Sequence, residues 1–373
     1  CLVVTGSHIP FNRNGLKFYR AEGEISKHDE ALMREAVVSV PSEIKPFYLS
    51  AVDNSSRMAF VRRYLDFFGA QALAGMRVAV YEHSSVARDV LLDILQGLGA
   101  EVLSLGRTDT FVPIDTEAVC FEDVIQAKLW SHEHAFDAIL SSDGDGDRPL
   151  IGDESGQWLR GDLVGVLCAM YLKADTVVTP LSSNTALELC GAFSQVTRTR
   201  IGSPYVIAGM AQADATGKVV GFEANGGFLL GSDIHLNGRT LTRLPTRDAV
   251  LPMLALLCMA RELGVPISKL SHSLPKRYTA SDRLQQFDNQ KSKDLIAQFS
   301  KDLNYAASRL APDSGDIVLV NTVDGLRLNF TNGDIVHLRP SGNAPELRCY
   351  AEADTALRAQ CLCDEALNQV KNL

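Results

Sequence analysis

Three aspartates alternate with glycines in the segment SSDGDGDRPL, residues 141–150, and their spacing suits the binding of a hard divalent cation. Carboxylates this close together repel one another unless a cation lies among them. The glycines let the backbone bend, so that Asp143, Asp145 and Asp147 can all point inward. Oxygen ligands favour Mg²⁺, Mn²⁺ or Ca²⁺ over zinc. A metal-free acidic surface loop is the weaker alternative, because three such carboxylates at a strand end are costly without a partner.

An EF-hand calcium loop is a second alternative for this segment. Counted from Asp143, acidic residues fall at positions 1, 3 and 5, and Glu154 falls at position 12. Position 6 is Arg148, however, where the sharp turn of an EF-hand needs glycine. The preceding residues also predict a strand instead of a helix, so both features argue against an EF-hand.

The segment VTGSHIPFNRNGLKFY, residues 4–19, places a serine between a glycine and a histidine. Ser7 is followed by a proline and an Asn-Gly turn, and Lys17 comes ten residues after it. A serine on such a turn is held out at the end of a strand, although a structural role is the usual one for a single serine. The side chains of Ser7 and His8 diverge because the residues are adjacent, so His8 is not expected to act as a serine-hydrolase base. Lys17 taken alone is equally compatible with a surface lysine at a strand edge.

Two later loops carry polar side chains in patterns that suit a sugar and a phosphate. In GFEANGGFLL, residues 221–230, Glu223 and Asn225 could bond to neighbouring hydroxyl groups. Taken alone, a turn with a solvated glutamate is the better interpretation of that loop. In LRPSGNAPELRCYAEA, residues 338–353, two arginines flank a run of hydroxyl, backbone N–H and amide donors that could cradle a phosphate. A polar turn with two surface arginines explains the same residues equally well.

Composition indicates an ordinary soluble chain of 373 residues with a net charge of −9, which argues against a nucleic-acid surface. The longest apolar run, near residues 249–260, contains Pro252 and is too short to span a bilayer. No basic region precedes the apolar start, so a signal peptide is not expected. The eight cysteines form no C-x-x-C pair, and we interpret them as reduced thiols of a cytoplasmic protein.

Strands and helices alternate along most of the chain, which is typical of βαβ units and mostly parallel sheets with helices on both faces. The first helix has Ser26 as its N-cap, with Asp29 three residues later. After Pro275 the pattern changes to a helix at 291–306, several strands with hairpin signals and a terminal helix, which indicates an α+β domain. The other strands are predicted at 1–5, 15–20, 76–82, 100–106, 136–142, 175–179, 195–199 and 218–222, and the other helices at 26–38, 54–68, 84–98, 161–172, 184–191 and 203–211.

Four loops, in this order, resemble those of the α-D-phosphohexomutases, the phosphomannomutase/phosphoglucomutase group. The family's phosphoserine loop, T-[AG]-S-H-N-P-x-x-x-N-G-x-K, is similar to TGSHIPFNRNGLK at 5–17, and its metal loop DGDGDR matches residues 143–148. Its sugar loop, GE-x-S-G-H in many members, is similar to FEANGG at 222–227. Its phosphate loop, of the form RPSGTEPKIR, is similar to RPSGNAPELR at 339–348. The resemblance covers the whole chain.

The resemblance implies an α/β fold with three tandem mixed-sheet α/β domains and a C-terminal α+β domain around a central cleft. Combined with the change of pattern at Pro275, it predicts the following domains: a partial phosphoserine domain at 1–48, an α/β domain at 49–150 that ends in the metal loop, a sugar-binding α/β domain at 151–273 and a phosphate-binding domain at 274–373.

The activity implied by the resemblance is the interconversion of hexose 1-phosphate and hexose 6-phosphate, with mannose or glucose or both as the sugar. The reaction would pass through a phosphoserine at Ser7 and a hexose 1,6-bisphosphate, which also serves as primer. Ser7 and the three aspartates would hold one Mg²⁺. Lys17 would be the general acid/base, provided that burial or a cation such as Arg148 lowers its pKa. Arg148 would touch the transferring phosphoryl group, and His8 would line its site.

The remaining roles implied by the resemblance concern the two ends of the phosphosugar. The sugar would contact Glu223, Asn225 and Arg200, and the distal phosphate would contact Arg339, Ser341, Gly342, Asn343 and Arg348. The partner is therefore a phosphosugar, with no nucleic acid and no membrane, and the oligomeric state is left open.

The sequence also departs from the family pattern. The asparagine after Ser-His is Ile9, the sugar-loop serine and histidine are Asn225 and Gly227, and the phosphate-loop threonine is Asn343. Family members carry a longer segment before the serine, including F-G-T-x-G-x-R-G, so we expect the first domain to be partial and the chain to be a fragment or a processed product. Two alternative functions stay open: a catalytically impaired sugar-phosphate-binding protein, and a metal-dependent phosphatase that uses the aspartates directly.

Overall fold

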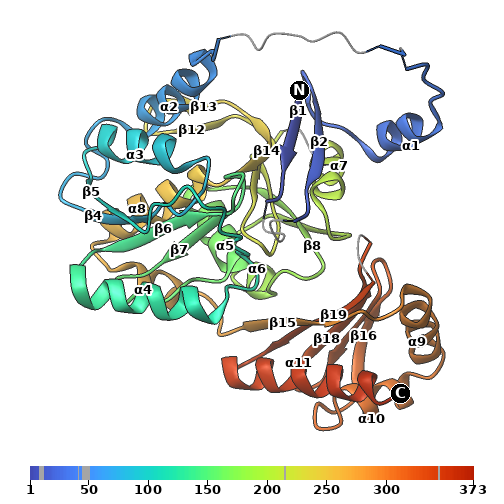
Figure 1. Ribbon diagram of the computed structural model, residues 1–373. Coiled ribbons are helices and arrows are strands. Elements are labelled where there is room, and N and C mark those ends of the chain that lie inside the picture. Colours follow the sequence, from blue (N-terminus) through green and yellow to red (C-terminus); the bar gives the residue numbers. More distant parts are fainter. Residues whose placement is uncertain (8–11, 41, 44–50, 214–215, 343–344) are drawn as a thin grey trace.

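The computed structural model of the chain describes residues 1–7, 12–40, 42–43, 51–213, 216–342 and 345–373. His8 and Asn343, two of the predicted site residues, lie outside the described residues. Within these ranges the elements form four groups that follow one another along the chain, each with its own main sheet (Figure 1). The predicted mixed α/β fold with several sheets is confirmed. The order of the groups follows that of the predicted domains, whose boundaries stay a prediction.

The first group is a three-stranded antiparallel sheet followed by one helix. Its elements are β1 (Leu2–Thr5), β2 (Gly15–Arg20), β3 (Gly23–Glu24) and α1 (Lys27–Glu35). The Ser26 side chain accepts a hydrogen bond from Asp29 N, and the Asp29 carboxylate accepts one from Ser26 N, so the predicted helix start is confirmed.

The second group is a sheet with strand order β5-β4-β6-β7, parallel except at β7. Its elements are α2 (Ser55–Phe68), β4 (Arg77–Tyr81), α3 (Arg88–Gly97), β5 (Glu101–Leu105), α4 (Phe121–His134), β6 (Ala138–Ser142) and β7 (Pro149–Gly152). The metal loop is the connection from β6 to β7, so it begins where a fully buried strand ends.

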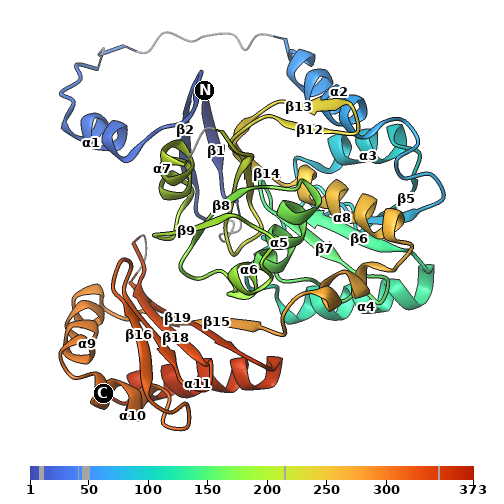
Figure 2. The ribbon, with the colours of Figure 1, turned by 180° about the vertical axis from the view of Figure 1, so that it is seen from behind.

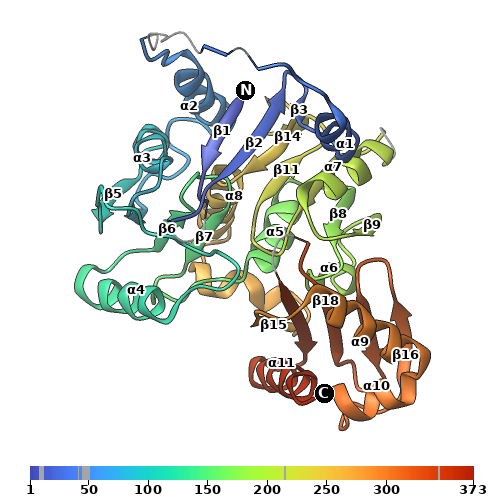
Figure 3. The ribbon, with the colours of Figure 1, turned by 45° about the vertical axis from the view of Figure 1, so that its right-hand side comes forward.

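The third group is a five-stranded sheet with order β14-β11-β10-β8-β9, parallel among β8, β9 and β10 and antiparallel at β11 and β14. Its elements are α5 (Gly161–Tyr171), β8 (Thr176–Pro180), α6 (Ala186–Leu189), β9 (Gln195–Thr199), α7 (Ser203–Gln212), β10 (Val219–Phe222), β11 (Phe228–Leu230), the hairpin β12 (Ile234–Leu236) and β13 (Arg239–Leu241), β14 (Leu244–Asp248), α8 (Val250–Leu263) and the 3-10 helix η1 (Ile267–Ser273). The hairpin reaches α2 of the second group (Figure 2). In Figure 3 the strands β1 and β2 lie beside β14, which places the N-terminal segment over the third group.

The fourth group is an antiparallel sheet with order β15-β19-β18-β17-β16. Its elements are β15 (Tyr278–Gln285), α9 (Asn289–Lys301), α10 (Leu303–Leu310), β16 (Ile317–Asn321), β17 (Leu326–Phe330), β18 (Ile335–Pro340), β19 (Glu346–Ala353) and α11 (Ala356–Lys371). The fourth group has its own hydrophobic core, whereas a single core cluster runs through the second and third groups. The shared core fixes the metal loop and the sugar loop relative to each other.

Several predicted elements differ from the structure for identifiable reasons. The helix predicted at 84–98 begins only at Arg88, because the hydroxyl of Ser85 bonds to the hydroxyl of Ser142 across the sheet edge at 2.7 Å. The helix predicted at 291–306 is two helices, because Asp302 ends α9 and caps α10 by accepting from Tyr305 N. The helices α4 and α8 were not predicted, and α8 is the apolar run that contains Pro252, which its first turn tolerates.

No single helix among the described residues is both long and apolar enough to cross a membrane. The pair α8 and η1 meets that requirement together by length and composition, with a bend of 83° between the two helices.

Candidate active site

Ser7 and the metal loop lie against each other in the structure, although 136 residues separate Ser7 from Asp143. The Oγ of Ser7 donates to Oδ2 of Asp143 at 2.7 Å, and Gly144 N donates to the carbonyl oxygen of Ser7 at 3.3 Å. A Cβ at position 144 would lie 2.7 Å from that oxygen, so the close approach requires glycine. The serine hydroxyl is therefore presented directly to the aspartate cluster.

The backbone of Ser7 adopts a conformation that residues other than glycine rarely adopt. Its φ is 47°, in the left-handed region, and its N–H donates to Oγ1 of Thr5 at 2.8 Å. Such a conformation costs on the order of 1–3 kcal/mol and persists only where surrounding contacts impose it. The contacts with Thr5, Asp143 and Gly144 supply that constraint.

The three aspartates of the metal loop fit a divalent cation. One carboxylate oxygen of each lies within 4.8 Å of the others. Asp143 is fully buried and its Oδ1 accepts from the N–H of Asp147 and Arg148 at 3.1 and 3.2 Å, which aims the loop inward. Among the described residues, Oδ1 of Asp145 and of Asp147 has no hydrogen-bond partner although both atoms are buried. Unsatisfied, hard oxygen atoms at this spacing are what a Mg²⁺ site requires.

The pKa values of the aspartates also suit a site for a cation. Burial, followed by the charges of Asp147 and Asp145, raises the pKa of Asp143 well above its usual range. Burial also opposes ionisation of Asp145, but the partnership with Lys17 outweighs it and the pKa of Asp145 is lowered. Of these two carboxylates, Asp143 is therefore the one whose negative charge its protein neighbours neutralise less well.

The EF-hand alternative is contradicted by the position of Glu154. Its carboxylate accepts from the N–H of Ser268 at 3.2 Å and from the hydroxyl of the same serine, at the start of η1. The residue that would close a twelve-residue calcium loop therefore faces a different part of the chain.

Lys17 reaches the metal loop from β2. Its Nζ pairs with Oδ2 of Asp145 and lies 2.7 Å from Oδ2 of Asp147. Burial acts to lower the pKa of Lys17, but the aspartates outweigh it and the pKa is raised. The lowered pKa that an acid/base lysine needs, whether from burial or from a cation such as Arg148, is therefore not present in this structure. Arg148 instead faces Asp143 and Asp147, with its Nε 3.7 and 3.8 Å from their oxygens. The charge of Arg247 acts to lower the pKa of Lys17.

Arg247 is the main residue of this site that sequence reasoning missed. It lies on β14 with only 9% of its side chain exposed, and its Nη2 is 2.9 Å from Oδ2 of Asp147. Its Nη1 is 3.8 Å from Oε2 of Glu223, and its Nε is 3.9 Å from Oε1 of Glu24 on β3. The one available signal was a charged residue, in LPTRD, within a strand that precedes a buried helix.

The sugar loop connects β10 to β11 and is buried, so the interpretation as a turn with a solvated glutamate is wrong. Burial raises the pKa of Glu223, and Arg247 opposes that effect. Oδ1 of Asn225 accepts from Gly227 N at 2.9 Å, and the carbonyl oxygen of Asn225 accepts from Oγ1 of Thr116 at 2.7 Å. The side-chain oxygen of Asn225 therefore shapes the loop, which leaves its amide N–H groups as the donors that could face a sugar.

The predicted phosphate loop follows β18. Ser341 N donates to the carbonyl oxygen of Glu346 at 2.8 Å, and a Cβ at Gly342 would meet no described atom within 4 Å. Nη2 of Arg348 lies 3.5 Å from Oε2 of Glu346, and Nε of Arg339 lies 2.8 Å from Oδ2 of Asp324. Each of these two arginines is thus paired with an acidic side chain of the fourth group.

Asp324 also joins the fourth group to the third. Its Oδ2 accepts from Ile201 N at 2.8 Å, and the carbonyl oxygen of the preceding Val323 accepts from Nε of Arg200 at 3.0 Å. Arg200, the predicted sugar-contacting residue, therefore lies against the turn between β16 and β17 that also holds Arg339.

A histidine supports this turn and makes stability depend on pH. His337 is buried and its Nε2 donates to the carbonyl oxygen of Asp324 at 2.6 Å. Burial lowers the pKa of His337 to about 4. The unfolded chain therefore binds a proton below its ordinary pKa of about 6.5 while the folded protein does not, so stability is lost as the pH falls from about 6.5 toward 4.

We therefore expect the His337→Asn variant to lose less stability than the parent protein between pH 7 and pH 4.5. The difference should be on the order of 2–3 kcal/mol in the free energy of unfolding. Urea unfolding at the two pH values measures it, with His132→Asn on the exposed side of α4 as the control. An unchanged pH dependence in His337→Asn would show that other groups cause the loss.

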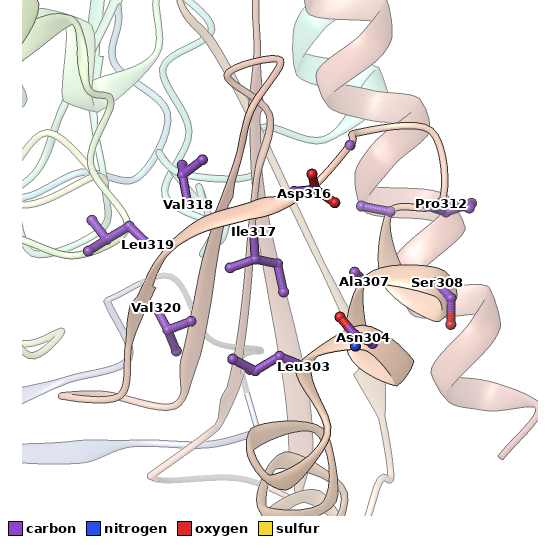
Figure 4. A pocket seen from close by; sticks show the side chains of 12 residues that line it. Leu303, Asn304, Ala307, Ser308, Pro312, Asp316, Ile317, Val318, Leu319 and Val320 are labelled. Atoms are coloured by element: carbon purple, nitrogen blue, oxygen red, sulfur yellow. The ribbon is translucent and has the colours of Figure 1, made fainter.

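A pocket of about 680 Å³ lies elsewhere, between α10 and the edge strand β16. Figure 4 shows Ile317 of β16 above Leu303 of α10, with Val318 and Leu319 on the strand. None of the predicted site residues that the structure describes lines this pocket.

Known proteins resemble this chain along its whole length. Models of the phosphoglucomutase/phosphomannomutase family match it, the alpha/beta/alpha domain III at residues 160–278 and the C-terminal domain at 288–369. A phosphomannomutase of Salmonella muenchen is 46% identical over 100% of this chain and 77% of its own length. A phosphomannomutase of Sinorhizobium fredii is 44% identical over 98% of this chain and 78% of its own length.

Solved structures resemble the fold at lower sequence identity. A phosphoglucomutase/phosphomannomutase family protein from Burkholderia thailandensis superposes with a TM-score of 0.72, at 19% identity, over 100% of this chain and 76% of that one. The N-acetylphosphoglucosamine mutase of Aspergillus fumigatus, solved with GlcNAc-6P and magnesium, superposes with a TM-score of 0.56, at 16% identity, over 85% of this chain and 66% of that one.

Proposed function

Since the chain belongs to the α-D-phosphohexomutase family, we propose that it interconverts hexose 1-phosphate and hexose 6-phosphate, with mannose or glucose or both as the sugar. The family assignment makes the protein a mutase, an intramolecular phosphotransferase. The observation that supports the proposed chemistry best is the 2.7 Å contact between Ser7 Oγ and Asp143 in a cluster of three carboxylates.

We assign the phosphoryl carrier to Ser7. In the forward half-reaction a hydroxyl oxygen of hexose 1-phosphate forms a bond to the phosphorus on Ser7, and the bond from that phosphorus to Oγ breaks. The product is a hexose 1,6-bisphosphate, which turns over within the site. The reverse transfer returns the other phosphate to Ser7, so no phosphate or water is consumed.

Lys17 is the proposed group that exchanges the proton of the sugar hydroxyl. Its ion pairs with Asp145 and Asp147 keep it charged, so it can accept a proton only when those carboxylates are engaged elsewhere. Asp143, Asp145 and Asp147, together with the phosphoserine, would hold one Mg²⁺. When bound, that ion would neutralise charge on the transferring phosphoryl group. Arg148, beside two of the three aspartates, would contact the same group.

The rest of the phosphosugar would be held by residues from two groups of elements. Glu223 and Asn225 would bond to sugar hydroxyls, and Arg200 would lie toward the sugar phosphate. The proposed anchor for the distal phosphate consists of Arg339, Ser341, Gly342, Asn343 and Arg348. Arginine forks and backbone N–H groups suit this task because they bind phosphate oxygens in pairs.

A coupled assay tests the proposed reaction. Mannose 1-phosphate or glucose 1-phosphate is supplied with Mg²⁺ and a trace of glucose 1,6-bisphosphate. Formation of the hexose 6-phosphate and release of inorganic phosphate are measured separately. We expect isomerisation that depends on the bisphosphate and releases no phosphate. Phosphate release without isomerisation would instead favour the metal-dependent phosphatase, and binding without either product would favour a sugar-phosphate-binding protein.

Replacement of Glu223 by glutamine should weaken substrate binding. The variant keeps the size of the side chain but removes the charge that strengthens bonds to sugar hydroxyls, so KM for hexose phosphate should rise about 10- to 100-fold with a smaller change in kcat. Steady-state kinetics measures both constants. Glu262→Gln, at the surface of α8, is the control that should leave them unchanged. An unaltered KM in Glu223→Gln would remove the sugar-binding role.

A further inference from the structure

Arg247 stands at the point where four segments of the chain meet. From β14 it faces Asp147 of the metal loop, Glu223 of the sugar loop and Glu24 of β3. Only its contact with Asp147, at 2.9 Å, is within hydrogen-bond distance; those with Glu223 and Glu24 are 3.8 and 3.9 Å. Among the described residues no partner takes a hydrogen bond from its buried Nε. A single guanidinium therefore faces three carboxylates.

The space for this side chain is provided by Gly227. A Cβ at position 227 would lie 2.9 Å from Cδ and 3.1 Å from Cγ of Arg247. The neighbouring Gly226 has a φ of 89° and needs glycine for its backbone, but Gly227 has no such positive φ. Space, and not conformation, therefore explains the glycine at position 227. The sugar loop lacks a side chain where the stem of Arg247 crosses it.

The pairing of β11 with β14 places Arg247 beside the sugar loop. Phe228, which follows that loop, pairs with Asp248 in this antiparallel pair, and the register shifts between this pair and Leu230–Leu244, so Arg247 lies at an irregular part of the ladder next to the paired Asp248. Asp248 itself is buried and accepts from the N–H groups of Val250 and Leu251, which fixes the strand end against α8. Arg247, next to this anchored strand end, thus faces the two loops that carry the proposed sugar and metal ligands.

We propose that Arg247 is a positioning residue that holds the carboxylates of Glu223 and Asp147 in place from the space that Gly227 leaves open. The inference rests on the proposed function. A planar guanidinium can face two carboxylates with different edges, whereas the ammonium of a lysine is a point charge. Arg247 also separates the two negative charges, which would otherwise repel each other across the site.

Binding measurements on Arg247→Met test this role, since methionine keeps much of the stem but removes the guanidinium. Calorimetry with Mn²⁺ alone and with mannose 6-phosphate alone should show both dissociation constants raised, each about 10-fold or more, because the hydrogen bond that orients Asp147 and the charge that faces Glu223 are lost together. Arg247→Lys should recover the Mn²⁺ affinity, through Asp147, better than the sugar affinity. The control Arg243→Met, in an exposed position before β14, should change neither.

A double-mutant cycle with Gly227→Ala tests the packing. In the parent protein the new methyl group should displace Arg247 and raise the dissociation constant for mannose 6-phosphate. With Arg247→Ala in place the same change should have a smaller effect, because only the contact of the methyl group with Oδ1 of Asn225, at 3.1 Å, remains. Additive effects of the two substitutions would overturn the proposal, as would an Arg247→Met variant that folds and binds both ligands normally. Because both readouts are binding constants, a parent protein that binds the ligands but lacks mutase turnover would refute the proposed function and leave this test intact.

Discussion

Ser7→Ala is expected to abolish mutase turnover, with a loss on the order of a millionfold in kcat, the size seen when a covalent nucleophile is removed. The methyl group of alanine cannot carry a phosphoryl group. Among the described residues, the hydroxyl that donates to the carboxylate of Asp143 is that of Ser7, so the variant has no replacement for it. The loss should appear in kcat because the missing step is the transfer itself. The coupled assay for formation of hexose 6-phosphate measures it.

Two further readouts separate this role from a structural one. Intact-mass spectrometry after incubation with glucose 1,6-bisphosphate should show one phosphate ester on the parent protein and none on Ser7→Ala. Mn²⁺ should still bind the variant, because the three aspartates remain. Ser131→Ala is the matched control, because the hydroxyl of Ser131 donates to backbone carbonyls on the outside of α4. A Ser7→Ala variant with the full rate would favour direct use of the aspartates, as in a phosphatase.

The features that sequence analysis predicted well are those determined by short stretches of chain. The capping box at Ser26 and Asp29 depends on two residues in one turn, and it forms as expected. The spacing of Asp143, Asp145 and Asp147 places three carboxylates on one loop, where their own repulsion indicates a cation. The carboxyl end of the buried strand β6 then brings that loop to the sheet edge.

The features that sequence analysis missed depend on long-range pairing. Arg247 reaches the site only because β14 adds to the edge of the third sheet next to β11, in the register that pairs Asp248 with Phe228. No spacing of residue types within β14 encodes that pairing. The state of Lys17 was missed for a similar reason: its pKa depends on Asp145 and Asp147, which lie more than a hundred residues away in sequence.

Local patterns also failed where side chains compete with the helix backbone. Ser84 and Ser85 extend the apparent helix before Arg88, but the Ser84 hydroxyl accepts from Val112 N at 2.8 Å and Ser85 bonds across the sheet edge. Serine readily makes such bonds outside helices, so the helix begins later. The same competition splits the helix predicted at 291–306, at Asp302.

Asp143→Asn should have opposite effects on catalysis and on the stability of the metal-free protein. The amide keeps the size of the side chain but removes the most buried charge of the metal loop. Mn²⁺ affinity should fall about 100-fold, because the charge of the ligands sets the affinity of such sites. Activity should fall on the order of a thousandfold, because the charge that stabilises the transferring group is lost with the metal. Calorimetry and the coupled assay measure the two losses.

The stability of the metal-free protein follows from the sign of the pKa shift. Burial and two neighbouring carboxylates raise the pKa of Asp143, so between its unfolded and folded values the folded state holds the additional proton. Stability therefore falls as the pH rises through that range, and at neutral pH the ionised group destabilises the fold. The metal-free Asp143→Asn variant should consequently be more stable than the parent protein at pH 7, and its unfolding should depend less on pH.

Added Mg²⁺ should reverse that order at pH 7, because a ligand that binds only the folded state stabilises it in proportion to its affinity. Thermal unfolding with and without Mg²⁺ compares the two proteins, with the exposed Asp109→Asn as the control. If Asp143→Asn lost activity but bound Mn²⁺ normally and gained no stability, Asp143 would act on the hydroxyl of Ser7 and not as a metal ligand. The expected result is thus that Asp143→Asn is the more stable protein without Mg²⁺ and the less stable one with it. Neither a misfolded variant nor a proton-accepting role of Asp143 would produce this reversal. It would identify Asp143 as a carboxylate that the fold tolerates because a cation neutralises it.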